Sequence, residues 1–198
     1  MRPAVFLDRD GTLLEEAGYV DRLERLVLFP FSVDAVRLLN RSDLAVVVVT
    51  NQSGVGRGIY DEDFVHRAHR LIAERMAAGG ARIDGFYYCP HHPAAEIQQY
   101  RVDCDCRKPL PGMLRRAAAE LSIDLSRSFT VGDKWSDVEL ARRVGARGIL
   151  VRTGYGAATE QSSGAGIDVA TVVDNLAAAA AWMLAEAART AGPAGRPA

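Results

Sequence analysis

One continuous apolar run, Leu-Ala-Val-Val-Val-Val at residues 44–49, constrains the fold of this chain more than any other feature. Such a β-branched run is typical of a strand that is buried on both faces, as in a parallel sheet. Further strand candidates are residues 4–7, 83–88, 129–131 and 148–151, which alternate with helix candidates at 31–39, 61–78, 113–121, 138–144 and 175–188. The alternation predicts an α/β fold, a Rossmann-like three-layer sandwich with a mostly parallel sheet. Ser32 is the expected N-cap of the first helix, and His66 and His69 are expected to be solvated on the second.

Polar residues follow three of these predicted strands directly. Asp8 follows residues 4–7, Thr50 follows residues 44–49, and Asp133 comes just after residues 129–131. In open α/β sheets, ligands bind beyond the carboxyl ends of the strands. We therefore expect these three side chains to meet in one crevice, although they lie far apart in the sequence.

The composition argues against several classes of protein. Lys plus Arg total 24 and Asp plus Glu total 25, so there is no basic excess for binding nucleic acid. No apolar run approaches the roughly 20 residues of a membrane helix, and the first residues show no signal-peptide pattern. We expect a cytoplasmic, monomeric protein with one domain at residues 1–188 and a disordered tail at 189–198.

Two carboxylates, Asp8 and Asp10, lie two residues apart at the end of the first predicted strand. One carboxylate can attack a phosphoryl group to form an aspartyl-phosphate, and the other can protonate the leaving alkoxide and then deprotonate water. Attack of one anion on another is opposed by roughly 4 kcal/mol for each pair of unit charges about 4 Å apart. A Mg²⁺ ion bound by oxygen ligands such as Asp133, together with an ammonium group, would offset this repulsion. Lys108, one of only two lysines in the chain, is the candidate for the ammonium.

Residues 8–12, 50–51, 108 and 132–137 resemble the four ordered motifs of the haloacid dehalogenase-like phosphatases. The resemblance implies that Asp8 is the nucleophile and that Asp10 is the general acid and then the general base. It further implies that Thr50, with the backbone at Asn51, binds the transferring phosphoryl group, and that Lys108 neutralises it.

The same resemblance implies a magnesium site. Asp8, the carbonyl group of Asp10 and Asp133 would bind Mg²⁺, and Asp137 would orient the water molecules around the ion. These ligands come from the first and the last of the four motifs, so the site depends on the predicted meeting of strand ends.

All three cysteines, Cys89, Cys104 and Cys106, lie in an 18-residue window beside His91 and His92. Their odd number and the expected reducing compartment argue against disulfides. Three thiolates and one imidazole complete a tetrahedral structural Zn²⁺ site. The spacing Cys89-x-His91 matches Cys104-x-Cys106, so His91 is preferred to His92 as the fourth ligand. Three free thiols are the alternative for this segment, which we call the zinc loop (residues 89–106).

Residues 50–58, 87–93, 104–109 and 111–113 are similar to the D-glycero-D-manno-heptose 1,7-bisphosphate 7-phosphatases. This resemblance implies a capless enzyme that removes the 7-phosphate in nucleotide-activated heptose synthesis, for lipopolysaccharide or other glycans. Histidinol-phosphate phosphatase, a close relative, is the alternative substrate assignment. A non-catalytic binding module built on the zinc loop is the alternative of another class, and the presence of Asp8 and Asp10 argues against it.

A sugar bisphosphate carries a second phosphate that must be bound away from Asp8. Arg57 and Arg107 are candidates because a guanidinium group binds phosphate through two parallel hydrogen bonds. A solvated loop charge is the alternative for Arg57. The other candidate substrate contacts are Asn51, Gln52, Ser53 and Lys134.

Overall fold

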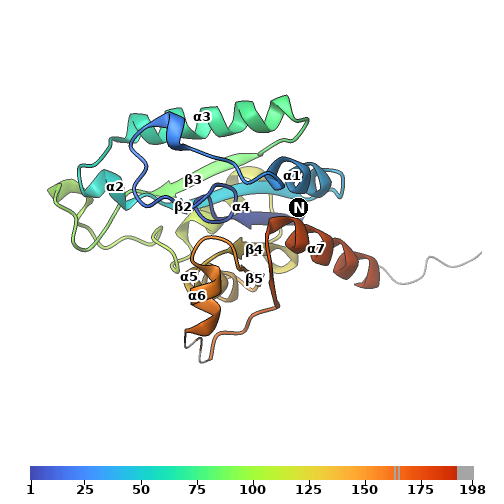
Figure 1. Cartoon of the computed structure of the whole chain (residues 1–198). Coiled ribbons are helices and arrows are strands. Elements are labelled where there is room, and N and C mark those ends of the chain that lie inside the picture. Colours follow the sequence, from blue (N-terminus) through green and yellow to red (C-terminus); the bar gives the residue numbers. More distant parts are fainter. Residues whose placement is uncertain (163, 165, 191–198) are drawn as a thin grey trace, which may run out of the picture.

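Six parallel strands form one sheet in the computed structural model, which describes residues 1–162, 164 and 166–190 (Figure 1). The strands are β1 (Ala4–Leu7), β2 (Ala45–Asn51), β3 (Gly85–Cys89), β4 (Phe129–Gly132), β5 (Arg147–Val151) and β6 (Thr171–Val173). Their order across the sheet is β3-β2-β1-β4-β5-β6, and each neighbouring pair is parallel. The predicted parallel α/β sheet is therefore confirmed.

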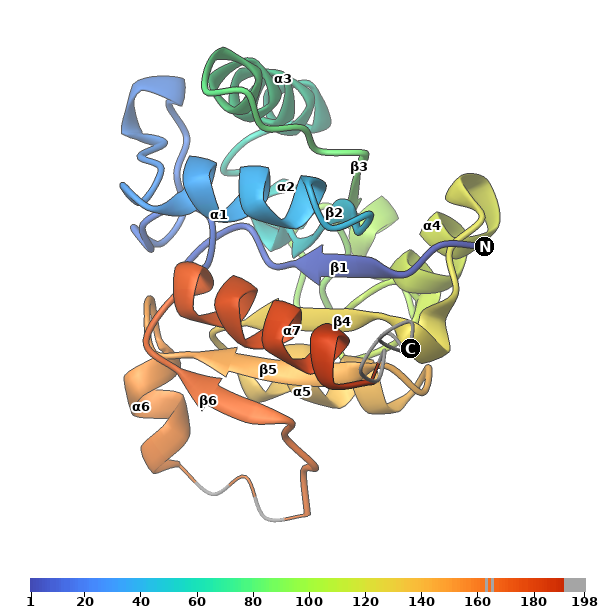
Figure 2. The ribbon, with the colours of Figure 1, turned by 90° about the vertical axis from the view of Figure 1, so that its right-hand side faces the viewer.

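Helices cover both faces of this sheet (Figure 2). They are α1 (Ser32–Asn40), α2 (Ser53–Gly56), α3 (Glu62–Ala78), α4 (Gly112–Leu121), α5 (Trp135–Arg142), α6 (Gly156–Gln161) and α7 (Leu176–Thr190). Short 3₁₀ turns at Leu23–Arg25, Gln98–Tyr100 and Leu125–Arg127 complete the described elements. α1, α3 and α7 pack on one face, and α4 and α5 pack on the other.

Alternation along the strands separates the two cores. In β1, Val5 and Leu7 belong to the core beneath α1, α3 and α7, whereas Ala4 and Phe6 belong to the core beneath α4 and α5. Successive side chains of a strand point to opposite faces, so a strand with apolar residues at every position fits between two helical layers. The apolar run at residues 44–49 likewise places alternate side chains in the two cores.

The chain winds outward from β1 to β3 and then returns to place β4 on the other side of β1. The order of the strands therefore reverses between β1 and β4, and a crevice at such a point is where ligands bind in this class of fold. Asp8 and Asp133 follow these two strands directly. No large segment is inserted between Asp10 and β2: this part of the chain contains residues 13–29, which we call the flap, and α1.

The structure also corrects some details of the sequence prediction. Ser32 is the first residue of α1, with Phe31 as the N-cap, and its hydroxyl instead donates to the carbonyl group of Leu13 at 2.8 Å. α6 and β6 were not expected, because α6 is short and β6 is a half-exposed edge strand of three residues. α7 ends at Thr190. Residues 191–198 of the expected tail lie outside the described residues.

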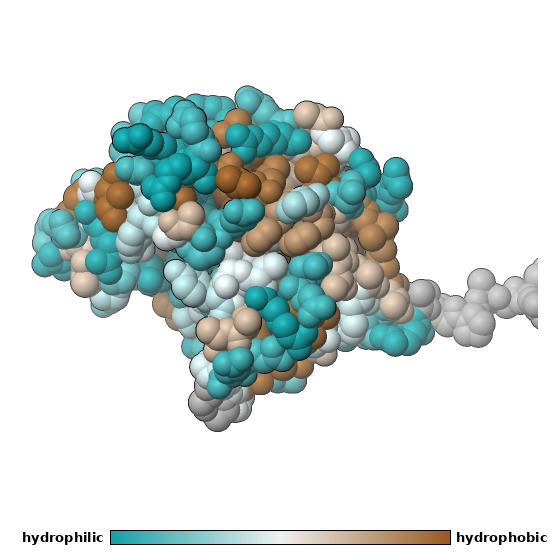
Figure 3. Space-filling view, in the orientation of Figure 1, coloured by the Kyte–Doolittle hydropathy of each residue, from teal (hydrophilic) through white to brown (hydrophobic). Residues whose placement is uncertain are grey.

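The helices and the surface can also be described by their hydrophobicity. No helix in the described part of the chain is long and apolar enough to cross a membrane. On the face seen in Figure 1, hydrophilic side chains cover the upper rim, and hydrophobic ones gather near the centre below α3 (Figure 3).

Candidate active site and metal centre

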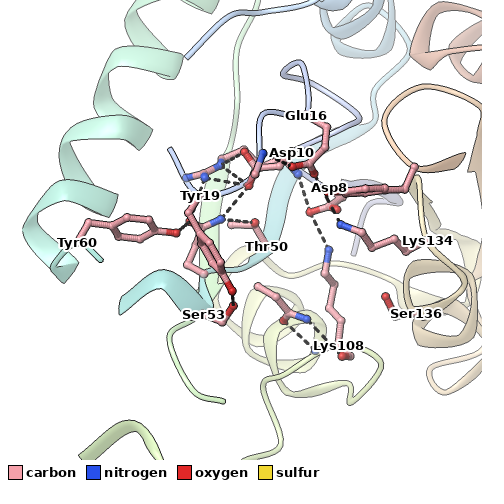
Figure 4. Close-up of a pocket in the computed structure, with 15 residues that line it drawn as sticks. Asp8, Asp10, Glu16, Tyr19, Thr50, Ser53, Tyr60, Lys108, Lys134 and Ser136 are labelled. Atoms are coloured by element: carbon pink, nitrogen blue, oxygen red, sulfur yellow. Dashed lines mark hydrogen bonds and ion pairs between the residues drawn. The ribbon is translucent and has the colours of Figure 1, made fainter. Parts of the chain in front are cut away.

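A pocket of about 280 Å³ opens at the carboxyl ends of β1 and β2 (Figure 4). Eight of the residues predicted from the sequence line it: Asp8, Asp10, Thr50, Asn51, Gln52, Ser53, Lys108 and Lys134. Asp133 lies among the buried carboxylates beside Asp8. The expectation that residues after three different strands would meet in one crevice is therefore correct.

The Lys108 ammonium lies between two carboxylates. Its Nζ is 2.8 Å from Asp8 Oδ1 and 2.6 Å from Asp137 Oδ1, and it donates to the carbonyl group of Val49 at 3.1 Å. The Lys108 side chain is only 3% exposed, so these three oxygens replace its water. Asn51 fixes the backbone of Lys108, because its Oδ1 accepts from the Lys108 amide at 3.0 Å and its Nδ2 donates to the Lys108 carbonyl at 3.3 Å.

Burial is the largest single influence on the pKa values of Asp8 and Lys108. Burial raises the pKa of the Asp8 carboxyl to about 7. The charge of Lys108 opposes this rise, whereas the charges of Asp137 and Asp133 add to it. Burial also lowers the pKa of Lys108, but the carboxylates of Asp137 and Asp8 outweigh burial and raise it overall. A further cation near Asp8 would favour the ionised, nucleophilic form of this carboxyl.

Asp8, Asp133 and Asp137 form a cluster whose oxygen atoms lie within 4.8 Å of one another. Asp133 is fully buried, and its Oδ1 has no hydrogen-bond partner among the described residues, although Lys134 Nζ lies 3.8 Å away. Burial raises the pKa of Asp133 to about 6, against the opposing effect of Lys134 and of the Tyr155 amide. Carboxylate oxygens suit Mg²⁺, and a buried oxygen without a donor fits a metal ligand.

Two glycines make room for Asp133. A Cβ atom on Gly11 would lie 2.3 Å from Asp133 Oδ2, and one on Gly154 would lie 2.4 Å from the same oxygen. Both glycines have positive φ angles, 81° and 57°. That oxygen also accepts from the Tyr155 amide at 2.8 Å. Two adjoining backbone segments, at Gly11 and at Gly154, therefore pack closely against this carboxylate.

The Asp10 carboxylate turns toward Arg9 and away from this cluster. Arg9 Nη2 lies 2.8 Å from Asp10 Oδ2, and Arg9 Nε donates to Asp10 Oδ1 at 3.0 Å. The Arg9 side chain is 4% exposed, so its charge is compensated inside the protein. Asp8 is thus paired with Lys108, and Asp10 is paired with Arg9.

The cysteines and one histidine of the zinc loop form a second cluster. Cys89 Sγ lies 3.7 Å from Cys104 Sγ and 3.1 Å from Cys106 Sγ, and His91 Nδ1 lies 3.3 Å from Cys106 Sγ. In a tetrahedral site with zinc–sulfur bonds of about 2.3 Å, neighbouring sulfurs are about 3.7 Å apart, so the four residues fit such an ion. His92 is outside the cluster, and its Nδ1 accepts from the Ala94 amide at 3.0 Å.

The thiols of this cluster are free, and they perturb one another. The hydrogen bond between Cys106 and Cys89 lowers the pKa of Cys106 to about 5, against the effect of burial, and His91 lowers it further. The same bond raises the pKa of Cys89, and burial adds to this rise. A lowered thiol pKa favours the thiolate, which is the form that binds metal.

The two arginines predicted to contact a second phosphate lie outside the pocket lining. The Arg57 guanidinium lies over the ring of Tyr19 at 6.0 Å. Arg107 donates to the carbonyl group of His91 at 3.0 Å and so fixes the zinc loop. Lys134 does line the pocket, with Nζ 4.7 Å from the ring of Tyr155.

The flap reaches both walls of the pocket through residues that the sequence analysis did not single out. The Tyr19 hydroxyl lies 3.3 Å from Ser53 Oγ on one wall, and Glu16 lies 3.8 Å from Lys134 Nζ on the other. Tyr60, just before α3, also lines the pocket. No sequence signal singles out these flap residues, because their position depends on how the flap folds over the strand ends.

The prediction for the two remaining histidines is wrong in one case. His66 is exposed on α3 as expected, but His69 is only 7% exposed and its ring stacks on that of Phe86. Burial lowers the pKa of His69 to about 3, and the charge of Arg9 lowers it further. His69 is therefore a neutral, buried residue.

Known proteins similar to this chain were found by sequence and by structure. A family model described as HAD-hydrolase-like matches residues 105–179. A D-glycero-beta-D-manno-heptose-1,7-bisphosphate 7-phosphatase from Photorhabdus laumondii is 43% identical over 174 residues, which are 87% of this chain and 92% of the relative. A D-glycero-D-manno-heptose-1,7-bisphosphate 7-phosphatase from Thermosynechococcus vestitus is 44% identical over 187 residues, or 92% and 95% of the two chains.

Solved structures agree with these relatives. The crystal structure of a D,D-heptose 1,7-bisphosphate phosphatase from B. bronchiseptica, complexed with magnesium and phosphate, matches this chain with a TM-score of 0.81. The two chains are 34% identical, and the match covers 93% of this chain and 99% of the other. The similarity thus extends over nearly the whole length of both proteins.

Proposed function

This chain belongs to the D-glycero-D-manno-heptose-1,7-bisphosphate 7-phosphatase family of haloacid dehalogenase-like hydrolases, and we propose that it removes the 7-phosphate of this sugar bisphosphate. The observation that carries the proposal is the buried pairing of Asp8 with Lys108 at the floor of the pocket. A carboxylate in this position can act as a nucleophile toward phosphorus while the ammonium group balances the added charge.

The reaction proceeds in two halves. First, an oxygen of Asp8 bonds to the phosphorus atom, the bond between phosphorus and the C7 oxygen breaks, and Asp10 gives its proton to that oxygen. Then Asp10 takes a proton from a water molecule as the water oxygen bonds to phosphorus, which releases inorganic phosphate and the Asp8 carboxylate. Transfer of a proton by a positioned carboxyl group is typically worth about 10²–10⁴ in rate.

Thr50 and Lys108 bind the group that is transferred. The Thr50 hydroxyl donates to a phosphoryl oxygen, and the Lys108 ammonium attracts both the phosphoryl group and the carboxylate of Asp8. Asp8, the Asp10 carbonyl group and Asp133 would hold Mg²⁺, which would supply positive charge that lowers the repulsion between nucleophile and phosphate. The buried Asp133 oxygen without a hydrogen bond supports this assignment.

We also propose that Cys89, His91, Cys104 and Cys106 bind a structural Zn²⁺ ion. The spacing of the four ligand atoms supports this, as does the position of the cluster two residues before Lys108. All four ligands come from the protein, so the ion has no open position for substrate. Its role is to order the zinc loop and thereby the backbone that carries the catalytic ammonium.

The alternatives are less well supported. A binding module without catalysis would have no need of a nucleophile, a paired ammonium and a second carboxyl in one pocket. Histidinol phosphate carries one phosphate, whereas Lys134 and Ser53 offer polar contacts on opposite walls of this pocket for a substrate with two. Arg57 and Arg107 can contact the second phosphate only if their side chains leave Tyr19 and the zinc loop.

The test compares three substrates at saturating Mg²⁺: D-glycero-D-manno-heptose 1,7-bisphosphate, heptose 7-phosphate and histidinol phosphate. We expect the largest kcat/KM for the bisphosphate, with phosphate released from C7 and C1 still esterified. The matched control, Asp8→Asn, should remove activity on all three. A higher kcat/KM for histidinol phosphate would overturn the substrate assignment, and full activity of Asp8→Asn would overturn the mechanism.

A further inference from the structure

Gln52 is 2% exposed and uses every hydrogen-bonding position of its side chain. Its Nε2 donates to Asp10 Oδ2 at 3.0 Å and to Thr50 Oγ1 at 2.8 Å. Its Oε1 accepts from Arg9 Nη2 and from the Tyr60 hydroxyl, each at 2.9 Å. A side-chain amide has two donor hydrogens and two acceptor lone pairs, so this amide is fully satisfied.

These partners determine which way the amide points. Arg9 has donors but no acceptor, so only the oxygen of Gln52 can face it. The nitrogen must then face Asp10 and Thr50, both of which offer acceptor oxygens. A rotation of the amide by 180° would set its N–H groups against Arg9 and leave Asp10 without a donor from Gln52. Gln52 is thus held in one orientation.

This orientation directs the hydroxyl hydrogen of Thr50. Because Thr50 Oγ1 accepts from Gln52 at 2.8 Å, its own hydrogen points away from the amide. The hydroxyl group is therefore free to donate to an oxygen in the pocket, where the proposed phosphoryl group binds. The amide thereby makes Thr50 a donor toward the substrate.

The same amide also constrains Asp10. Asp10 Oδ2 accepts from Gln52 at 3.0 Å and from Arg9 Nη2 and Nε at 2.8 Å and 3.1 Å. Asp10 Oδ1 accepts only from Arg9 Nε among the described residues, at 3.0 Å. Oδ1 is consequently the oxygen with room for a proton, and it is the one from which a leaving group can take it.

We propose that Gln52 is a positioning residue that sets the distance between the phosphoryl-binding hydroxyl of Thr50 and the acid–base carboxyl of Asp10. This inference rests on the proposed phosphatase activity. The oxygen bound by Thr50 and the leaving oxygen protonated by Asp10 belong to the same phosphate ester, so one rigid amide aligns both contacts. Without it, Asp10 keeps its bonds to Arg9 but loses its alignment to the ester.

The nature of the leaving group separates this role from a general loss of structure. A sugar alkoxide needs the proton of Asp10 when the phosphorus–oxygen bond breaks, whereas p-nitrophenolate leaves without one. Misplacement of Asp10 therefore slows transfer from an alkyl phosphate to Asp8 but not transfer from p-nitrophenyl phosphate. Hydrolysis of the aspartyl-phosphate, which needs Asp10 as base, is slowed for both substrates.

The experiment uses the Gln52→Met variant, whose side chain has similar length and no hydrogen-bonding amide. Single-turnover reactions with enzyme in excess measure sugar release from heptose bisphosphate and nitrophenolate release from p-nitrophenyl phosphate. We expect about a 100-fold slower release of the sugar, less than a threefold change for nitrophenolate, and accumulation of aspartyl-phosphate. In a separate reaction with p-nitrophenyl phosphate in excess, the burst of nitrophenolate counts the folded active sites, so partial misfolding does not distort the comparison.

Three control variants bracket this result. Asp10→Asn removes the acid itself and should show the same dependence on leaving group. Thr50→Val should slow both releases alike, because it weakens phosphoryl binding. Tyr60→Phe leaves both donor hydrogens of Gln52 in place and should lose less activity than Gln52→Met.

Two outcomes would overturn the inference: equal slowing of both releases in Gln52→Met, or unchanged sugar release. Failure of the substrate assignment is a separate outcome, because it would appear in the wild-type protein as absence of heptose bisphosphate hydrolysis. In that case the same comparison is made with glycerol 3-phosphate as the alkyl ester.

Discussion

His69 connects the stability of this protein to pH through a neutral buried imidazole. Its ring stacks on Phe86 with centroids 4.7 Å apart, and its Nε2 has no hydrogen-bond partner among the described residues. The substitution His69→Phe keeps a flat ring in this position and removes the titrating group. We expect it to make the protein less sensitive to acid.

The size of the effect follows from the two pKa values of His69. Burial lowers the pKa from 6.5 to about 3 in the folded protein, so between these values the unfolded chain binds a proton that the folded protein does not. Stability is therefore lost as the pH falls below 6.5. Linkage predicts that the free energy of unfolding falls by about 2 kcal/mol between pH 8 and pH 5. The loss reaches its limit of about 5 kcal/mol below pH 3. For a protein of this length, about 2 kcal/mol corresponds to roughly 4–8 °C in Tm.

The assay is urea denaturation of the wild-type protein and of His69→Phe at pH 8 and pH 5, with both proteins fully loaded with zinc. The wild-type free energy of unfolding should fall by about 2 kcal/mol more than that of the variant. Asp8 and Asp133, whose raised pKa values act in the opposite direction, are present in both proteins and cancel. Losses that agree within about 0.5 kcal/mol would refute a neutral His69.

Three other predictions concern the site. Lys108→Arg should lower kcat about 100-fold or more in steady-state assays, because a broad guanidinium cannot replace an ammonium that is 3% exposed between two carboxylates; near wild-type turnover would contradict this. Cys104→Ser should lower zinc content, measured by mass spectrometry, together with phosphatase activity, and an intact, zinc-free and fully active variant would disprove the coupling. Gly154→Ala should raise the Mg²⁺ concentration needed for half-maximal activity about 10-fold, since the new Cβ lies 2.4 Å from Asp133 Oδ2; an unchanged Mg²⁺ titration would show that this carboxylate tolerates displacement.

Features that depend on local pattern could be predicted from the sequence. The apolar run at 44–49 and the alternation of strands and helices define a parallel sheet, and the strand ends bring Asp8, Thr50 and Asp133 together. The clustering of Cys89, His91, Cys104 and Cys106 also agrees with what their residue types and spacing predict. In these cases the physical cause lies within a few residues of the side chain concerned.

Features that depend on long-range packing could not be predicted in this way. The burial of His69 depends on β3, which supplies Phe86 from a separate part of the chain. The contact of the flap with Ser53 depends on the folded course of residues 13–29. Likewise, nothing near Arg57 in the sequence indicates that its guanidinium lies over Tyr19.

Four aspartates of this site illustrate why residue type alone does not determine role. Asp8 and Asp137 share the Lys108 ammonium, Asp10 is bound by Arg9 and Gln52, and Asp133 accepts from a backbone amide.

These partners separate the roles of the carboxyls. Of the two carboxyls beside the ammonium, only that of Asp8 lines the pocket, and it is the proposed nucleophile. Asp10, beside a guanidinium and an amide, is the proposed acid and base. The one with a buried oxygen lacking a hydrogen bond suits a metal ion. Substitutions of the partner residues should therefore affect different steps: we expect replacement of Gln52 to slow proton transfer by Asp10, and replacement of Lys108 to weaken Asp8 as a nucleophile.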